Sequence, residues 1–561
     1  MSGVGVLGRL VSVGPRAAAG VVHEVATPVR DLAGGLRVLQ REGLVEPARL
    51  DRTLRAARDT RRLGPITAAI RLARRRAPGA VALLDAHGEL TFAQLDDAAA
   101  ALAHRLLGLG AAAGARPPVV GLLGRDPRGA VQVLAACGYA GARAVLLNTG
   151  SAAPQLGAVL AREGVGIVVH DAEFDDLVRA ALADAGLDLP LLRADDLGGP
   201  PAVPVAPPPT PARSGGLVVL TSGTTGVPKG APRPKVSPLQ TAQVMDRLPF
   251  PRGATVVMAA PVFHGTGLSQ TCIALSSCCR VVLPGRFDAR RVADLVRRTE
   301  AEVLVLVPTM LHRLLALDDA ATALASVRRI YVGGSALTPE LCRRAQATLG
   351  DVVHNLYGST EVGIAAVATP ADLALAPGCV GRPPVAAHVR VLGLAPQRRE
   401  VAPGESGVIF VRSALAFTGY SDGSGKEVVG GYVSTGDIGR IDAHGLLHVI
   451  GRDDDMIVSG GENVVPARVE QLLDAHPSVD EAVVVGVPDE EFGQRLRAVV
   501  VPAPGATVDP EELRDLARTQ LARHEVPREV WTVEALPRNA TGKVLRRVLA
   551  AASSPDEVGG T

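Results

Sequence analysis

The stretch LTSGTTGVPKG, residues 220–230, contains the first of only four lysines in a chain that has 59 basic residues. It follows the apolar run GLVVL, which favours a β-strand, so the stretch is expected to form a loop after that strand. Its three glycines let the backbone approach a ligand closely, and its serine and threonines offer donors that suit phosphate oxygens. A flexible surface turn uses the same residue types, so the loop alone leaves both interpretations open.

The loop differs from a Walker A motif. In GxxxxGK[ST] a glycine stands five positions after the first one, but Pro228 stands five positions after Gly223. The motif also has a serine or threonine after its lysine, whereas Gly230 follows Lys229. This spacing disfavours an ordinary P-loop kinase or GTPase.

The rarity of lysine favours the phosphate-binding interpretation. Where almost all basic positions are arginine, a lysine indicates a site that needs a compact ammonium group on a flexible stem. Lys229 and Lys543 both lie beside glycine in polar loops, TTGVPKG and PRNATGK. Lys426, in SDGSGKE, and Lys235 have the surroundings of ordinary solvated loop residues.

Length and composition set the broad class of the protein. The 561 residues allow about three or four compact units. The net charge of +2 is close to balanced, which argues against nucleic acid as a partner. The six cysteines form no CxxC pair and have no histidine at metal-ligand spacing, so we expect reduced thiols in a cytoplasmic protein.

The N-terminal part of the chain is rich in arginine. Arg9 and Arg16 interrupt its apolar start, so no secretion signal is expected, and the apolar residues 129–142 are too few for a membrane span of roughly 20 residues. Patterns such as LDRTLRAARDTRRL predict helices throughout residues 1–75. These helices either pack on the core or form a basic amphipathic surface that contacts a membrane peripherally.

Short apolar runs alternate with helical stretches from residue 80 onward, as in VALLDA, FAQLDDAAAALAHRLLGLG, PVVGLLG, AVQVLAACGYAG and RAVLLN. This alternation is typical of βαβ units and of a largely parallel sheet. The proline-rich segment 199–216 is expected to be an exposed connector that leads into the strand before the loop. The sequence therefore predicts an α/β protein.

Further motifs follow the loop along the chain. They are PVFHGTGL (261–268), YVGGSAL (331–337), NLYGSTEVG (355–363), GYVSTGDIG (431–439), GRDDDMIVSGGENV (451–464) and LPRNATGK (536–543). With these motifs in this order, the chain resembles the adenylate-forming superfamily, which holds acyl-CoA synthetases, peptide-synthetase adenylation domains and luciferases. The resemblance covers about residues 80–550.

The resemblance implies a division into domains. After the helical extension of residues 1–75, residues 76–452 are expected to form a large domain of parallel-rich sheets flanked by helices, with a small barrel. Residues 453–561 are expected to form a smaller, mobile α+β domain that carries a catalytic lysine. This domain rotates between two half-reactions, about a hinge that aligns with Asp454.

The implied reaction needs ATP, Mg²⁺ and coenzyme A. A carboxylate attacks the α-phosphate to give an acyl adenylate and pyrophosphate, and a thiol then displaces AMP. Because the first step brings two anions together, the site must neutralise charge and exclude water. By resemblance, Thr221 and Glu361 hold the metal, and they act in catalysis together with Lys543.

The resemblance assigns the nucleotide and substrate sites as well. Asn355 and Tyr357 pack on and read the adenine, and Asp437, assisted by Arg452, binds the ribose. The implied ATP-binding residues are Thr221, Ser222, Gly223, Thr224, Thr225, Gly226, Lys229, Gly334, Asn355, Tyr357, Gly358, Thr360, Asp437 and Arg452. The implied acyl-binding residues are His264, Gly265, Thr266 and Gly333, and the implied CoA-binding residues are Gly460 and Gly461.

Two departures from the family pattern stand near these sites. Val458 occupies a hinge-motif position that is often lysine or another polar residue in relatives. The segment after PKG contains Pro232 and Pro234, which resist the helix that is usual there.

The implied function is an AMP-forming acyl-CoA ligase, an acid–thiol ligase. Small and apolar residues in the segments 265–268 and 273–274 favour a medium- or long-chain fatty acid and hence lipid metabolism, with an aryl or other carboxylic acid as the alternative. A rival from another class is a non-catalytic nucleotide-fold protein that attaches to membranes, and the intact Lys229, Glu361, Asp437 and Lys543 argue against it. A homodimer is compatible with the sequence.

Overall fold

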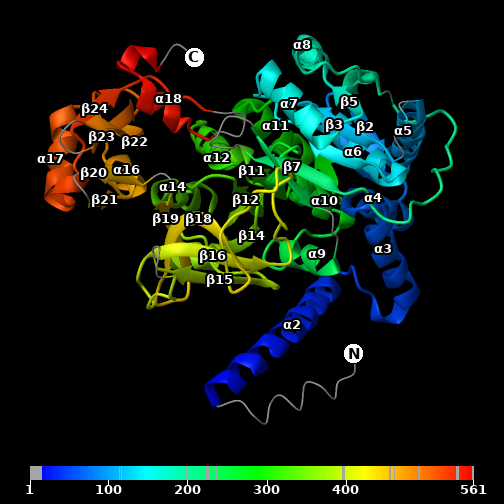
Figure 1. The fold of residues 1–561 in the computed structure, drawn as a ribbon, viewed down its shortest axis with the longest axis horizontal. Coiled ribbons are helices and arrows are strands. Elements are labelled where there is room, and N and C mark those ends of the chain that lie inside the picture. Colours follow the sequence, from blue (N-terminus) through cyan, green and yellow to red (C-terminus); the bar gives the residue numbers. More distant parts are fainter. Residues whose placement is uncertain are drawn as a thin grey trace.

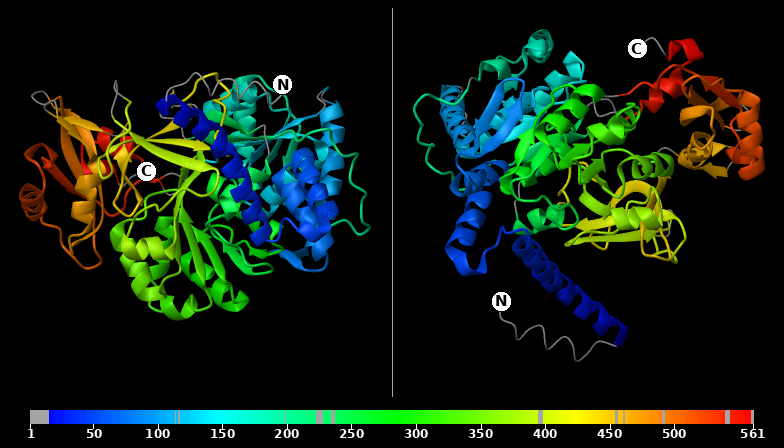
Figure 2. Two further views of the ribbon diagram at one scale, coloured as in Figure 1. Left: turned by 90° about the horizontal axis from the view of Figure 1, so that it is seen from below. Right: turned by 180° about the vertical axis from the view of Figure 1, so that it is seen from behind.

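The computed structural model describes most of the chain. The described residues are 15–112, 114, 117–197, 199–221, 228–233, 237–393, 398–453, 456–459, 462–489, 493–538 and 543–558. They form a large domain and, at one end of it, a smaller C-terminal domain that is a distinct lobe in each view (Figures 1 and 2).

Two mainly parallel sheets form the body of the large domain. The eight-stranded sheet has the order β14 (Gly363–Ala368), β13 (Val353–Ser359), β12 (Arg329–Gly333), β11 (Val303–Leu306), β9 (Thr255–Met258), β10 (Arg280–Val282), β1 (Val81–Asp85) and β2 (Gly88–Thr91). The six-stranded sheet has the order β6 (Leu191–Arg193), β5 (Ile167–His170), β3 (Val119–Leu123), β4 (Arg143–Leu146), β7 (Leu217–Thr221) and β8 (Lys229–Arg233).

The inner strands of both sheets pair in parallel, and antiparallel strands stand only at edges: β2 and β14 in the larger sheet and β8 in the smaller. Every residue of β11, VLVL, and of β5, IVVH, is buried. Continuous burial of this kind is expected where helices cover both faces of a parallel sheet. The expected βαβ organisation is thus present.

Helices cover these sheets. In chain order they are α4 (Pro65–Arg76), α5 (Phe92–Ala112), α6 (Pro127–Ala140), α7 (Ala153–Glu163), α8 (Asp175–Ala185), α9 (Pro238–Met245), α10 (Gly265–Ser276), α11 (Ala289–Thr299), α12 (Pro308–Leu315), α13 (Ala320–Ala323), α14 (Pro339–Leu349) and α15 (Pro370–Leu375). Within the described ranges, no helix is long and apolar enough to cross a bilayer.

A barrel-like sheet and the C-terminal domain complete the fold. The sheet consists of β15 (Ala387–Leu392), β16 (Gly407–Ser413), β18 (Tyr432–Ile441), β17 (Val428–Val429) and β19 (Leu447–Arg452). The C-terminal part holds β20 (Ile457–Ser459), β21 (Glu462–Val464), α16 (Pro466–Asp474), β22 (Val479–Asp489), β23 (Gly493–Pro502), α17 (Pro510–Gln520), β24 (Glu529–Thr532) and α18 (Arg546–Ala551). The predicted fold class is confirmed.

The N-terminal extension contains α2 (Pro15–Arg41) and α3 (Leu50–Leu63), which continues into α4. Helix α4 lies inside the core of the large domain, because Ile70 and Ala73 are fully buried. It approaches α6 so closely that a side chain at Gly138 would collide with Thr67. The arginine-rich pattern therefore covers one core helix as well as two peripheral ones.

Candidate active site

A cavity of about 1380 Å³ lies where both large sheets, the barrel-like sheet and the C-terminal domain meet. Lys229 of β8, Tyr357 of β13, Arg452 of β19 and Lys543 of the C-terminal domain all line it. Because parallel strands end at a common edge, ligand sites of open α/β sheets form there, and the cavity follows this rule. Residues more than 300 positions apart in the sequence thus share one site.

Three of the four lysines of the chain, Lys229, Lys426 and Lys543, line this cavity, and the fourth, Lys235, lies outside the described residues. Lys426 was expected to be an ordinary solvated residue, and that expectation is wrong. With Arg452, which also lines the cavity, these groups make it strongly cationic, as a polyphosphate requires. The scarcity of lysine in the sequence was the signal that could have identified Lys426.

Lys229 is held by the loop between β16 and β17. Its Nζ donates a hydrogen bond to Ser424 Oγ (3.0 Å) and lies 3.4 Å from Asp422 Oδ2. Its ammonium group also lies 5.4 Å from the ring centre of Tyr420. Hydrogen bonds from Ser424, together with Lys229, lower the pKa of Asp422 to about 2, so its carboxylate is charged at neutral pH. These contacts orient the lysine at the cavity wall.

Glu361 lies at the same wall. Its Oε1 accepts a hydrogen bond from the Tyr420 hydroxyl (2.5 Å), and its backbone N–H donates to Ser359 Oγ (3.2 Å). Burial raises the pKa of Tyr420 above its usual value, as does the carboxylate beside it, so the phenol remains a donor. Among the described residues no donor is bound to Oε2, which leaves that oxygen for a metal ion.

Arg233 of β8 is a cavity residue that the sequence reasoning missed. One Nη donates to the Thr360 carbonyl, and the other is buried and has no hydrogen-bond partner among the residues that the structure describes. Burial lowers the pKa of Arg233 to about 10, against the opposing effect of the Glu361 carboxylate. The sequence around β8, which is flanked by prolines, does not indicate a buried cation. Arg233 faces the cavity only because of the way the chain folds.

Tyr357, Asp437 and Arg452 form a connected group. The Tyr357 hydroxyl donates to Asp437 Oδ2 (2.5 Å), and Arg452 Nη1 lies 3.4 Å from Asp437 Oδ1. Burial raises the pKa of Tyr357 well above its usual value, and the adjacent carboxylate adds to this effect, so the phenol stays protonated. Tyr357 and Arg452 line the cavity, and Asp437 lies directly behind them.

His264 and the first turn of α10 form another part of the cavity wall. Gly265 and Thr266 line the cavity with it. In the described part of the chain His264 Nε2 is buried without a hydrogen-bond partner, and burial lowers the pKa of the imidazole to about 4. A neutral imidazole with this pKa is a weak base at neutral pH, which agrees with a role in binding rather than in proton transfer.

Two predicted ligand residues are placed away from the cavity. Asn355 precedes Tyr357 on β13 by two residues, which places it roughly 7 Å farther from the end of the strand. At that position it is buried, and its amide donates to the Cys379 carbonyl (2.9 Å). A side chain at Gly333 would meet Leu356 at 3.0 Å, so this glycine serves the contact between β12 and β13. Gly334, with a φ of +96°, does line the cavity.

The remaining predicted residues divide into three groups. Gly358 and Thr360 line the cavity. Thr221 ends β7, and its side chain is outside the described part. Eight predicted residues lie entirely outside the described ranges: Ser222, Gly223, Thr224, Thr225, Gly226, Asp454, Gly460 and Gly461.

The residues present fit ATP and Mg²⁺. In the part of the chain that the structure describes, no three His, Cys, Asp or Glu side chains gather into a metal site. Mg²⁺ commonly binds through one or two carboxylates together with substrate phosphates. Glu361, which lines the cationic cavity, matches that mode, and the lysines and Arg452 match the phosphates.

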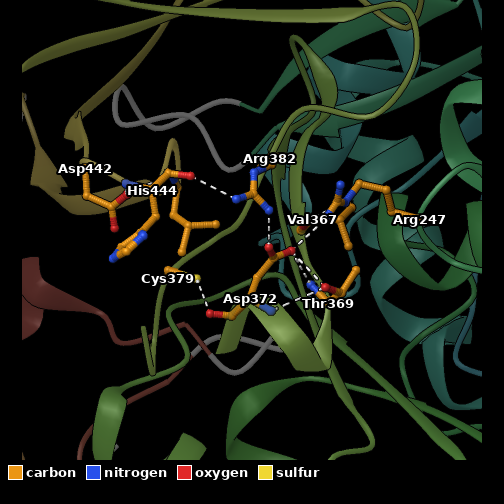
Figure 3. A network of polar contacts seen from close by, with 9 residues as sticks. Arg247, Val367, Thr369, Asp372, Cys379, Arg382, Asp442 and His444 are labelled. Carbon is orange, nitrogen blue, oxygen red and sulfur yellow. Dashed lines mark hydrogen bonds and ion pairs between the residues drawn. The ribbon is translucent and has the colours of Figure 1, made fainter. Parts of the chain in front are cut away.

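An ion-pair network around the buried Asp372 supports the strands that carry the site (Figure 3). Asp372 accepts hydrogen bonds from Arg247 and Arg382, each at 2.5 Å, and from Thr369 N and Oγ1. Burial alone would raise the pKa of Asp372, but the Thr369 hydrogen bonds and the two guanidinium groups hold it below its usual value. Arg247 also donates to the Val367 carbonyl of β14, which ties the network to the strand beside Tyr357.

We expect Asp372→Asn to lower the free energy of unfolding of the large domain by about 3 kcal/mol, because it leaves two guanidinium groups partly buried without a charge partner. Urea unfolding followed by circular dichroism measures this. The pKa of Asp372 is depressed in the folded state, so the difference from wild type should shrink as the pH falls through that pKa. The matched control is Asp319→Asn, an exposed partner of Arg290 with an expected effect below about 1 kcal/mol.

Comparisons with known proteins place the chain in a family. The model of the AMP-binding enzyme family matches residues 70–421, and that of its C-terminal domain matches residues 468–543. The chain therefore belongs to the AMP-binding enzyme family, which confirms the superfamily expected from the motifs.

Three similar proteins illustrate the family. A feruloyl-CoA synthase from Amycolatopsis is 33% identical over 482 residues, 84% of this chain and 96% of its own. An indoleacetate–CoA ligase from Aromatoleum aromaticum is 34% identical over 490 residues, 83% and 94% of the two chains. The crystal structure of ATP-bound MatB from Rhodopseudomonas palustris superposes with a TM-score of 0.73 at 28% identity, covering 86% and 98%. The expected enzyme class, an acid–thiol ligase, is confirmed, whereas the two named ligases act on aromatic acids.

Proposed function

We propose that the protein is an ATP-dependent acyl-CoA ligase that activates a medium- or long-chain fatty acid and then forms its CoA thioester. The observation that carries the choice of acid is the shape of the apolar part of the cavity. Gly265, Leu268, Ser269 and Cys272 share one face of α10, and all line the cavity. From His264 this wall runs roughly 12 Å along the helix axis.

The apolar part continues beyond α10. Cavity-lining residues follow on α4, which packs against α10, and on α6: Ile66, Thr67, Leu134, Cys137 and Gly138. A compact aromatic acid would fill only the portion near His264. An alkyl chain would follow the wall and remove far more apolar surface from water, at about 25 cal/mol for each Å² buried.

The polar end of the cavity suits the first half-reaction. Lys229 and Lys543 bring positive charge to the region where two anions must approach one another, and Glu361 Oε2 would hold Mg²⁺. Bound Mg²⁺ would neutralise phosphate charge and orient the phosphates. Tyr357 and Arg452 contact Asp437 directly behind the part of the wall where a nucleotide would present its ribose. His264, neutral and apolar in its surroundings, would limit water near the reacting carboxylate.

An acid panel tests the substrate class. We expect pyrophosphate release with octanoate and palmitate to exceed that with ferulate and indoleacetate by at least about tenfold in kcat/KM. The two aromatic acids are included because the named relatives act on them. Faster release with either aromatic acid than with every alkyl acid would contradict the proposal for a fatty acid and leave the ligase class intact.

A variant of the cavity wall tests the path of the chain. Cys272→Phe adds bulk on the cavity-facing side of α10, so kcat/KM for palmitate should fall about tenfold more than that for butyrate. Cys272→Ser keeps the size of the side chain and is the matched control, expected to leave the ratio of the two acids unchanged. An equal loss of kcat/KM for palmitate and butyrate would indicate that the alkyl chain does not pass Cys272.

A further inference from the structure

Helix α2 extends along the lower edge of the large domain in Figure 1. Its inner face is packed: Val38 and Leu39 are buried, and a side chain at Gly35 would lie 2.6 Å from Leu239 of α9. Asp31 lies 3.0 Å from His388 Nε2 of β15. These contacts fix the rotation of α2 on the domain, so its opposite face is turned to the exterior.

The outer face of α2 is apolar along one line. Val29, Leu32 and Leu36 are 65%, 68% and 53% exposed. Their spacing of three and four residues places them in a single stripe. Isolated exposed aliphatic residues are ordinary in proteins, but an aligned row on one helix indicates a surface that associates with another apolar phase.

A row of positive charge accompanies the stripe. Arg30 and Arg37, two helical turns apart, are exposed on the neighbouring side of α2. In the described part of the chain no carboxylate lies within ion-pair distance of either side chain. The nearest acidic residue in sequence, Asp31, is turned toward His388 on the inner face.

Helix α3 repeats this combination. Leu50 and Leu54 are 62% and 70% exposed, and Arg58 and Arg61 follow on the same side of the helix at a helical spacing. Neither of these arginines has a carboxylate partner among the described residues. In Figure 1, α2 and α3 lie at the same edge of the molecule.

We infer that the outer faces of α2 and α3 together form a docking surface for an anionic lipid membrane. Helices that lie in a membrane interface combine aliphatic side chains with arginines or lysines beside them. Each such cation is attracted to anionic headgroups, and the aliphatic side chains enter the acyl boundary. The surface is coupled to the site in one further respect, since Leu63 at the end of α3 lines the cavity.

A lipid surface fits better than a second copy of the chain. A helix pair between copies would be strengthened by opposite charges that flank the apolar stripe. On α2 the residues next to the stripe are Ala33 and Gln40, and the charged residues beyond them on the same side, Arg30 and Arg37, are both positive. Two copies would therefore bring arginines together, whereas phosphate headgroups complement them.

Vesicle sedimentation with the full chain tests this inference. The vesicles are phosphatidylcholine alone and an equimolar mixture with phosphatidylglycerol. We expect the wild-type protein to bind the mixed vesicles, and this binding should weaken with added salt. Two double variants, Leu32→Asn/Leu36→Asn and Arg30→Gln/Arg37→Gln, should each lower partitioning into these vesicles by about tenfold. Point variants are used because removal of α2 would uncover the core residues that Val38 and Leu39 cover.

Two double variants elsewhere on the surface serve as controls. Arg328→Gln with Arg399→Gln lowers the net charge by the same amount, and Leu375→Asn with Val428→Asn removes exposed aliphatic residues elsewhere. Both should bind like wild type, and pyrophosphate release in solution should be unchanged in all four. Three results would each overturn the inference. They are equal partitioning of all variants, no preference for vesicles that contain phosphatidylglycerol, and dimerisation in solution that the α2 variants abolish.

Discussion

Glu361→Gln should slow pyrophosphate release by about 10²-fold or more and raise the Mg²⁺ concentration needed for half-maximal rate. The substitution keeps the size of the side chain and removes the charge that would hold the metal. A preorganised electrostatic partner at a reacting phosphate is typically worth 10²- to 10³-fold in rate. Titration of Mg²⁺ at saturating ATP, with pyrophosphate release as the signal, measures both effects.

The contact between Glu361 and Tyr420 provides a graded comparison. Tyr420→Phe removes the hydrogen bond to Oε1 and leaves the carboxylate charged. One hydrogen bond to a charged group contributes about 1.5 to 3 kcal/mol, so the rate of pyrophosphate release should fall by roughly tenfold. The Mg²⁺ requirement should change less than it does in Glu361→Gln. Glu405→Gln changes an exposed carboxylate that accepts a hydrogen bond only from the Ala402 N–H among the described residues, and it should have no effect. An unchanged Mg²⁺ titration in Glu361→Gln would remove this residue from the metal site.

Motifs with distinctive chemistry were the most predictable part of the site. Tyr357, Glu361 and Lys543 were expected from their motifs and line one cavity. Their side chains need to reach a ligand from the ends of strands or from loops, so local sequence carries the signal. The α/β class followed from apolar runs of strand length that alternate with helical stretches, which is the pattern that doubly covered sheets impose.

Residues whose role depends on how deeply they are buried, or on a neighbouring strand, were less predictable from the sequence. Asn355 shares its motif with Tyr357, yet its position two residues earlier on β13 buries it against Cys379. Gly333 serves a contact with Leu356 that exists only because β12 and β13 pair. Lys426 and Arg233 reach the cavity through the path of the loop after β16 and the antiparallel edge strand β8, neither of which local sequence specifies.

The N-terminal helices show a similar limit of prediction from the sequence. Composition predicted helices, and the helices are present, but composition alone could not separate α4 from α3. Helix α4 is buried because it packs closely on α6 at Gly138 and lies against α10. Such contacts join residues about 70 and 200 positions apart, so they depend on the tertiary fold rather than on helical periodicity.

The C-terminal domain is seated on the large domain in this structure. Lys543 and Arg538 line the cavity together with residues of the large domain. His312 Nε2 of α12 lies 3.5 Å from Asp480 Oδ1 of β22, which gives a second contact between the domains. This arrangement brings the catalytic lysine predicted from sequence to the polar end of the cavity, where the first half-reaction would occur.

Lys543→Ala should therefore slow acyl-adenylate formation by roughly 10²- to 10³-fold, the effect of losing one preorganised charge partner at the α-phosphate. Thioester formation from synthetic acyl adenylate and CoA should be nearly unchanged, because the adenylate already contains the new bond and no pyrophosphate leaves in that step. Pyrophosphate release and thioester yield, measured separately on the same preparation, give the two rates. Arg547→Ala, a nearby cation of α18 that does not line the cavity among the described residues, is the matched control and should spare both steps. Equal slowing of both steps by Lys543→Ala would mean that the lysine maintains the C-terminal domain rather than acting on the first transition state.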